Sequence, residues 1–391
     1  MSRSRAWVGT AITTAAIMLA TTVTGCTSPE ETTERVVIGV DLELTGSGSY
    51  LGQVYRRALE LRVDQVNEAG LLGNRQLELK VMDNRTDSGV AVTNISKLIE
   101  DPEVVAIITG GCDACLLASL ESVTNAGVPV VSLGSTADLV EPVEERRYIF
   151  KLGPDAADVA QVLARELNRA GAEAIGLVTS DQPYGVEGQR EMLAAADRLD
   201  LEVVARSISE DGEGADAITA DLLTGEDPDA VVIWASGPAS GAVAHALRAR
   251  GFEGQILLAP SSADELFVPS AVRSALNGAR MVFTESLVID GLIASSPAKA
   301  ARQTWLREYT AQQGTYHAHA SFAADAIQVL VAAINASEST DRESIRAALE
   351  NTQIDGFTGP IRFRLETHSG LSPQALVMLV AQGDRWRLAA G

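Results

Sequence analysis

The chain has 391 residues, enough for two domains or one large one, and it is 46% hydrophobic and 21% charged, a globular composition rather than a disordered one. Its 31 Lys and Arg residues face 52 Asp and Glu residues, a formal net charge of −21, and aromatic residues make up only 4%. This balance excludes a nucleic-acid binder, which needs a basic surface and usually aromatic side chains for stacking. We therefore expect small molecules, or proteins with basic docking faces, as partners.

The N-terminus has the pattern of an export signal. Arg3 and Arg5 precede a run over 7–22 that is apolar or small and carries no charge. This run is shorter than the roughly 20 residues that a membrane-spanning helix requires. The pattern therefore predicts a cleaved signal peptide over 1–25 and a mature protein that works outside the cytoplasm.

The end of this signal is Val-Thr-Gly-Cys, at 23–26. It resembles the bacterial lipoprotein signal, which implies that Cys26 is acylated and anchors the mature chain to the membrane; two or more acyl chains hold a protein on a bilayer stably. An ordinary secretion signal is the alternative. Residues 26–35, rich in Thr and acidic residues, are expected to form a flexible tether.

Two further cysteines, Cys112 and Cys115, enclose Asp113 and Ala114. In an exported protein they could form a local disulfide, and two free or buried thiols remain the alternative. No second cysteine pair accompanies them, and nothing places the histidines at 317 and 319 nearby. The sequence therefore predicts neither a metal site nor a cofactor.

Strand and helix patterns alternate almost without interruption as far as residue 258. The expected strands, short runs rich in β-branched residues, cover 36–40, 77–82, 104–108, 130–133, 148–152, 174–179, 201–208, 230–234 and 255–258. The expected helices, with apolar residues on one face, cover 52–69, 90–99, 116–126, 157–170, 186–199, 215–223 and 239–250. This spacing predicts parallel sheets covered by helices on both faces.

The last third of the chain breaks this rhythm. The expected order is a strand, three helices and three strands: 281–288, 298–313, 322–335, 342–350, 360–365, 375–381 and a final strand near Trp386. We interpret this as an α/β protein of two doubly wound, Rossmann-like lobes joined by several crossings, with a cleft between them. The predicted division is 36–153 and 286–357 for the N-lobe, and 154–285 and 358–391 for the C-lobe. Ligands bind such sheets beyond the carboxyl ends of the strands.

A collinear series of motifs runs along the chain, most of them in loops after these strands, one at the end of the first helix and one in a late helix. They are Leu44-Thr45-Gly46, Asn67-Glu68-Ala69-Gly70, Asp83-Asn84, the run from Ala126 to Ser132, Gly134-Ser135-Thr136, the run from Asp181 to Gly185, Asp325-Ala326 and the run from Phe357 to Pro360. Together they resemble the branched-chain amino acid (Leu/Ile/Val) substrate-binding lipoproteins of ABC transporters, a branch of the type I periplasmic binding proteins. The resemblance spans essentially the whole mature chain and implies the same two-lobed fold.

In that family an α-amino acid is held by its two charged ends. The resemblance implies that the carboxylate is bound by the loop after the third strand and by backbone N–H groups after the fourth, where a helix start favours an anion. It also implies an aromatic side chain that closes over the ligand from the second lobe. The ligand-binding candidates are Tyr50, Asp113, Ala114, Gly134, Ser135, Thr136, Tyr184, Ser236 and Ser261.

Two positions depart from this pattern. Asp113 stands where the family usually has a hydroxyl, and an ionised carboxylate would repel a ligand carboxylate. The acidic residue expected after the strand 255–258 is replaced by Pro260-Ser261-Ser262, with Asp264 and Glu265 displaced along the chain. The ligand could turn a cation toward Asp113, or be an amide or other neutral molecule bridging Asp113, Ser135, Thr136 and Ser261. Alternatively, Asp113 caps the helix 116–126 and faces away from the ligand.

Three functions remain to be compared. The leading one is a lipid-anchored, monomeric solute-binding protein that captures a small polar ligand and delivers it to the transmembrane permease subunits of an ABC importer. A sensory receptor of the same fold, signalling to a membrane partner, is the alternative. An exported α/β enzyme is disfavoured, because no nucleophile–base pair or metal set can be assembled from the sequence.

Overall fold

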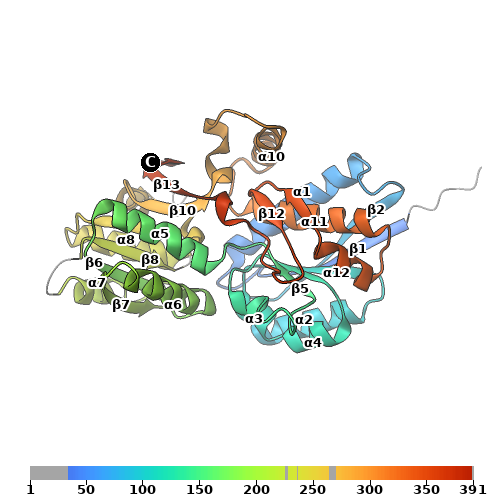
Figure 1. Cartoon of the computed structure of the whole chain (residues 1–391), viewed down its shortest axis with the longest axis horizontal. Coiled ribbons are helices and arrows are strands. Elements are labelled where there is room, and N and C mark those ends of the chain that lie inside the picture. The colour runs from blue at the N-terminus through green and yellow to red at the C-terminus, as the bar shows by residue number, and fades with distance from the viewer. Residues whose placement is uncertain (1–33, 225–227, 236, 264–269, 390–391) are drawn as a thin grey trace, which may run out of the picture. The chain divides into compact units, whose positions relative to one another are not determined.

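The computed structural model describes residues 34–224, 228–235, 237–263 and 270–389. The predicted signal peptide and Cys26, the predicted lipidation site, lie outside these residues. The first of two large sheets contains β1 (Glu34–Leu42), β2 (Arg75–Asp83), β3 (Val104–Thr109), β4 (Val130–Ser132) and β5 (Ile149–Lys151). All five strands are parallel, in the order β2-β1-β3-β4-β5. Figure 1 labels β1, β2 and β5 of this sheet. Parallel neighbours require crossover connections, of the kind that the alternation of strands and helices predicts.

Helices cover both faces of this sheet because β1 is apolar on both sides. Val36, Ile38 and Val40 are buried in the same core as residues of α1 (Ser49–Glu68), whereas Val37 is buried with residues of α2 (Ser88–Glu100). Successive side chains of a strand point to opposite faces, so an uninterrupted apolar run requires a cover on each. The helices that follow β3 are α3 (Asp113–Leu117) and α4 (Leu120–Ala126), and a short 3-10 helix, η1 (Ala137–Leu139), follows β4.

The second large sheet has seven strands in the order β14-β13-β10-β9-β8-β6-β7. They are β6 (Ala174–Ser180), β7 (Glu202–Ile208), β8 (Ala230–Trp234), β9 (Gln255–Leu258), β10 (Arg280–Thr284), β13 (Leu376–Gln382) and β14 (Arg385–Leu388). Its helices are α5 (Ala156–Ala170), α6 (Pro183–Asp197), α7 (Ala215–Leu222), α8 (Gly237–Ala249) and α9 (Ser270–Ala275). Only β13 and β14 among these strands run antiparallel to their neighbours.

Later segments of the chain return to both sheets. After η4 (Glu285–Gly291) and α10 (Pro297–Gln313), α11 (Ala320–Ser337) packs against α1, and α12 (Arg342–Leu349) packs against α11. By length and composition α11 is apolar enough to cross a membrane, but most of it is buried here as a core helix. The two-stranded sheet of β11 (Gln353–Asp355) and β12 (Pro360–Arg362) precedes the 3-10 turns η5 (Pro373–Ala375) and the return to β13.

The chain therefore forms two doubly wound α/β lobes, as the sequence predicts. The predicted lobe boundaries at 153/154 and 285/286 fall just after β5 and β10, where the chain leaves one large sheet. The boundary at 357/358 falls between β11 and β12, which pair with each other. The division stays a prediction.

Two elements differ from the sequence prediction, one by an interruption and one by an earlier end. The helix expected over 116–126 is broken into α3 and α4 at Ser119, whose buried hydroxyl donates to Cys115 O at 3.3 Å. A serine hydroxyl that bonds back to a carbonyl four residues earlier competes with the helical ladder. The strand expected over 281–288 ends at Thr284, because the chain turns into η4 there.

Each lobe has one point where the order of its strands reverses. In the first sheet the chain moves from β1 to β2 on one side and then to β3 on the other, so the reversal lies between β1 and β3. In the second sheet it lies between β6 and β8, for the same reason. Ligands of open α/β sheets bind at these switch points, beyond the carboxyl ends of the strands.

Candidate functional site

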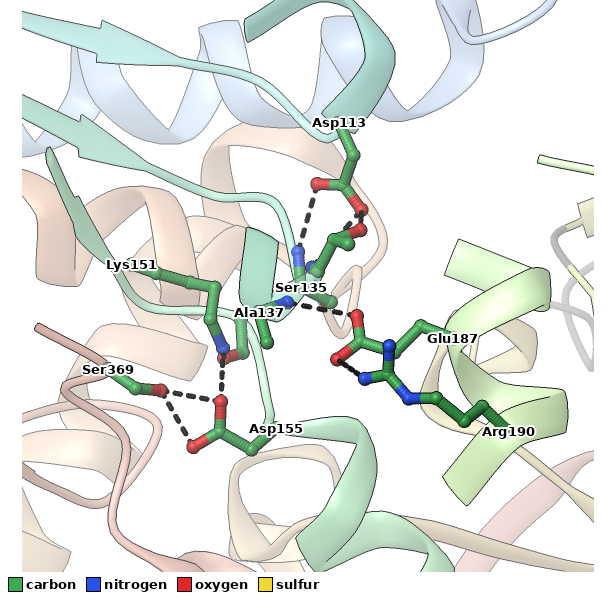
Figure 2. Close-up of polar contacts among 10 residues, drawn as sticks. Asp113, Ser135, Ala137, Lys151, Asp155, Glu187, Arg190 and Ser369 are labelled. Carbon is green, nitrogen blue, oxygen red and sulfur yellow. Dashed lines mark hydrogen bonds and ion pairs between the residues drawn. The ribbon is translucent and has the colours of Figure 1, made fainter. Parts of the chain in front are cut away.

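The carboxylate of Asp113 occupies the loop that follows β4. Oδ1 accepts a hydrogen bond from Ser135 N at 3.1 Å, and Oδ2 accepts from Thr136 N at 3.2 Å and from the Thr136 hydroxyl (Figure 2). A Cβ at Gly134 would collide with Oδ1, so this close approach requires glycine. Asp113 is buried, and burial raises its pKa against the lowering effect of these donors.

The next donor along this loop is used by the other lobe. Ala137 N donates to Glu187 Oε2 at 2.9 Å, and Glu187 lies one turn into α6 (Figure 2). Arg190 Nη2 lies 3.4 Å from Glu187 Oε1. Burial raises the pKa of Glu187 to about 7, despite the hydrogen bond from Ala137. The two lobes are thus joined by a hydrogen bond from the backbone N–H of Ala137, in the loop after β4, to the carboxylate of Glu187.

Glu43 lies at the switch point of the first lobe. It follows β1, and its Oε1 accepts a hydrogen bond from Cys112 N, in the loop after β3, at 2.5 Å. Its side chain is almost fully buried, and Oε2 has no hydrogen-bond partner among the described residues. A Cβ at Gly110 would collide with this carboxylate. Burial raises the pKa of Glu43 to about 7, and the charges of Asp41 and Asp113 add to the increase.

Cys112 and Cys115 are joined in a disulfide, the first of the two alternatives that the sequence leaves open. The bridge encloses Asp113 and Ala114 at the start of α3. The N-cap of this helix is Cys112, and the carboxylate of Asp113 is turned to the loop after β4. The alternative in which Asp113 caps the following helix is therefore wrong, because its two oxygens are engaged by Ser135 and Thr136. No group of three metal-ligating side chains is assembled within the part of the chain that the structure describes.

A buried lysine stands where the chain first leaves the N-lobe. The ammonium of Lys151, which is fully buried, donates to Gly153 O at 3.1 Å and to Asp155 Oδ1 at 2.5 Å (Figure 2). Asp155 also accepts from the Ser369 hydroxyl at 2.7 and 2.8 Å. This cluster joins the first crossing to the last returning segment, and Lys151 lowers the pKa of Asp113 through its charge.

Aromatic side chains flank the switch point of the second lobe. Tyr184 begins α6 just after β6, and Trp234 ends β8, with ring centroids 6.0 Å apart. Ser261 donates to Ala235 O at 2.8 Å, directly beyond β8. Burial raises the pKa of Tyr184, and the charge of Asp113, in the other lobe, contributes to the increase.

The remaining predicted residues are scattered. Tyr50 lies in α1, is 51% exposed, and its hydroxyl is 2.9 Å from His317 Nδ1. Ala114 lies beside Asp113 in α3. Ser236, Asp264 and Glu265 lie outside the described residues. The structure thus brings together Asp113, Ser135 and Thr136 in the first lobe, and Tyr184 and Ser261 in the second.

The sequence motifs do not predict three residues of this site: Glu43, Lys151 and Glu187. Glu43 could have been found, because it follows the first strand and the carboxyl-end rule covers every such loop. Glu187 lies three residues after Tyr184, hence on the same face of the helix. Its contact with Ala137 depends on lobe closure, which no local pattern reveals.

Replacing Glu43 by glutamine tests the state of this carboxylate. The raised pKa means that the folded state binds the Glu43 proton more tightly than the unfolded chain, so this residue lowers stability as pH rises from about 4 to about 7. Relative to the wild type, Glu43→Gln should gain about 3 kcal/mol in free energy of unfolding between pH 4 and pH 8. Urea unfolding at both pH values measures this gain. Glu60→Gln, at an exposed position, is the control for the loss of one charge, and equal gains in both variants would contradict the prediction.

The chain matches known proteins along most of its length. A family profile described as periplasmic binding protein covers residues 35–384. The "Chemotactic signal transduction system substrate-binding protein BasB" of Halobacterium salinarum is 26% identical over 265 residues, which cover 65% of this chain and 63% of that protein. "Leu/Ile/Val-binding protein homolog 8" of Brucella abortus is 29% identical over 143 residues, covering 37% of this chain and 35% of its own. The chain thus aligns with less than two thirds of either relative's length.

Solved structures match the fold more completely. The leucine binding protein LivK of Thermotoga maritima superposes with a TM-score of 0.78 at 22% identity, covering 91% of this chain and 98% of its own. An extracellular ligand-binding receptor of Rhodopseudomonas palustris HaA2 superposes with a TM-score of 0.80 at 21% identity. The superposition covers 90% of this chain and 99% of that receptor. At these identities the likeness shows the fold, which is that of the type I periplasmic binding proteins.

Proposed function

The chain belongs to the periplasmic binding protein family, and from this premise we propose that it is a lipid-anchored solute receptor that delivers a small polar ligand to an ABC importer. The family is one of extracytoplasmic solute-binding proteins rather than of enzymes. The observation that carries the proposal is the hydrogen bond between Ala137 N and Glu187. It joins the two lobes where strands end in each, which is where a ligand between them would lie.

Hinge closure is the proposed mechanism. A ligand that contacts both lobes binds the closed arrangement more tightly than the open one. It shifts the population toward closure only by that difference in affinity. We propose that the ion pair of Lys151 and Asp155 holds the backbone of the first crossing in one conformation while the lobes move.

Features of the sequence support the proposed membrane attachment and partner. Acylation of Cys26 would hold the receptor at the extracytoplasmic face of the membrane. The receptor has a net charge of −21, so a permease with a basic docking face would attract it electrostatically. ATP hydrolysis belongs to the importer in this proposal.

A sensory role is the second candidate, and one specific observation favours it. BasB, to which this chain is similar, is named as the substrate-binding protein of a chemotactic signal transduction system. A receptor of this kind would use the same lobes and the same closure. It would differ in the membrane protein that recognises the closed form.

Purification of the full-length lipoprotein from membranes, with and without ligand, separates the two roles. We expect permease subunits to co-purify, and we expect Cys26→Ala to release the receptor from the membrane. Recovery of a signalling protein in place of a permease would contradict delivery and support sensing. A soluble wild-type chain would contradict the lipid anchor.

A further inference from the structure

The backbone N–H groups of Ser135, Thr136 and Ala137, in the loop after β4, are already engaged by the protein itself. Ser135 N, Thr136 N and the Thr136 hydroxyl donate to Asp113, and Ala137 N donates to Glu187. Consecutive donors of this kind at the end of a strand form an anion-binding site. Here two protein carboxylates fill it, so a ligand carboxylate would find these donors engaged.

A buried hydrogen-bond acceptor at the β1/β3 switch point, by contrast, has no donor among the described residues. Glu43 is 2% exposed, its Oε2 has no partner among the residues described, and the charge of Asp113 acts on it. A buried carboxylate oxygen without a donor is costly, and such groups are normally satisfied. Since Glu43 joins the loops after β1 and β3, this oxygen lies where the fold places a ligand.

The cations of the site are already paired. The ammonium of Lys151 is held by Gly153 O and Asp155, and Arg190 is paired with Glu187 and Glu191. Trp234 Nε1 is a buried donor without a hydrogen-bond partner among the described residues, but it is neutral and supplies no charge. The site therefore has more carboxylates than unpaired cations, which favours a ligand that brings both positive charge and N–H groups.

We propose that the ligand is an organic cation without a free carboxylate, whose ammonium, amidinium or guanidinium group is bound by Glu43 and Asp113 at the β1/β3 switch point. This inference rests on the proposed function and names the ligand class of the same site. An organic cation carries N–H groups that can donate to Oε2 of Glu43, the buried acceptor without a partner among the described residues. Tyr184, whose ring centroid lies 6.0 Å from that of Trp234 at the switch point of the second lobe, supplies an aromatic face of the kind that attracts such cations.

Matched pairs of compounds that differ only in the carboxylate test this class. The pairs are arginine and agmatine, lysine and cadaverine, leucine and isopentylamine, and phenylalanine and phenethylamine. Calorimetric titration of the wild-type mature chain should give at least tenfold tighter binding of the amine in one or more pairs. Glu43→Gln should weaken that amine at least tenfold, because it removes the charge while keeping an acceptor for Cys112 N.

A second variant tests the filled anion site. Asp113→Ser frees Ser135 N and Thr136 N to bind a ligand carboxylate. The ratio of the affinity for the amine to that for the matching amino acid should therefore fall at least tenfold. Asp138→Ser, which removes an exposed carboxylate from the same segment, should leave the preference unchanged. Thermal unfolding of each variant shows whether it is folded before the ratio is interpreted.

The outcomes separate this inference from the proposed function. Wild-type binding of a free amino acid as tightly as its amine, or amine binding that survives Glu43→Gln, would overturn the ligand class. So would a wild type that binds none of the amines but binds a sugar or a neutral amide, and in that case the receptor function would stand. Failure to bind any compound of a broad solute screen would overturn both.

Discussion

Replacing Lys151 by methionine should lower the free energy of unfolding by about 3 kcal/mol. The lysine is fully buried, and its ammonium forms an ion pair with Asp155 and a hydrogen bond to Gly153 O. Without it, Asp155 retains the Ser369 hydroxyl but no cation. Because the cluster joins the first crossing to the last returning segment, the loss should appear as a lower midpoint in urea.

Lys80→Met is the matched control for this substitution. Lys80 pairs with Asp101 at 2.6 Å, but its side chain is 46% exposed. Exposed ion pairs contribute about 0 to 1 kcal/mol, so this variant should unfold close to the wild-type midpoint. Equal losses in the two variants would contradict a special role of the buried pair.

Replacing Asp325 by alanine should cost about 3 kcal/mol or more, because it leaves buried donors without an acceptor. Asp325 is fully buried on α11, and its carboxylate accepts from Phe357 N at 2.6 Å, Thr358 N at 2.8 Å and the Thr358 hydroxyl at 2.6 Å. These bonds fix the turn between β11 and β12 to the N-lobe. Burial raises the pKa of Asp325 to about 6.

Thr358→Val removes one of these three donors and keeps the carboxylate. We expect it to cost about 1 kcal/mol, the usual contribution of one hydrogen bond. Urea unfolding at a single pH compares the two variants. A loss in Thr358→Val as large as that in Asp325→Ala would mean that side-chain packing of Thr358, rather than the carboxylate, holds the turn.

Hydrophobic patterning is sufficient to predict the layers of the fold. The apolar runs of β1, β3 and β8 are continuous, which indicates strands buried on both faces, and the structure confirms this. Element ends are less predictable, because they depend on single polar side chains. The Ser119 hydroxyl that separates α3 from α4 contacts a backbone carbonyl rather than a patterned neighbour.

The site is predictable only in part. Asp113, Ser135 and Thr136 stand out because the motifs after the third and fourth strands place them together, and the structure brings them into contact. That the carboxylate fills the donors, rather than repelling or binding a ligand there, depends on a side-chain orientation that the sequence does not encode locally. The buried oxygen of Glu43 is visible only once the loops after β1 and β3 are assembled.

Hydrogen exchange of the mature chain, measured with and without a saturating amine that binds, tests capture between the lobes most directly. We expect simultaneous protection of the first-lobe loops at 110–115 and 134–137 and of the second-lobe segments at 181–187 and 234–235, because a ligand at both switch points orders both. Protection confined to one lobe would contradict this mechanism. So would protection limited to the surface groove of about 1030 Å³ that Glu141, Arg147 and Leu365 help to line.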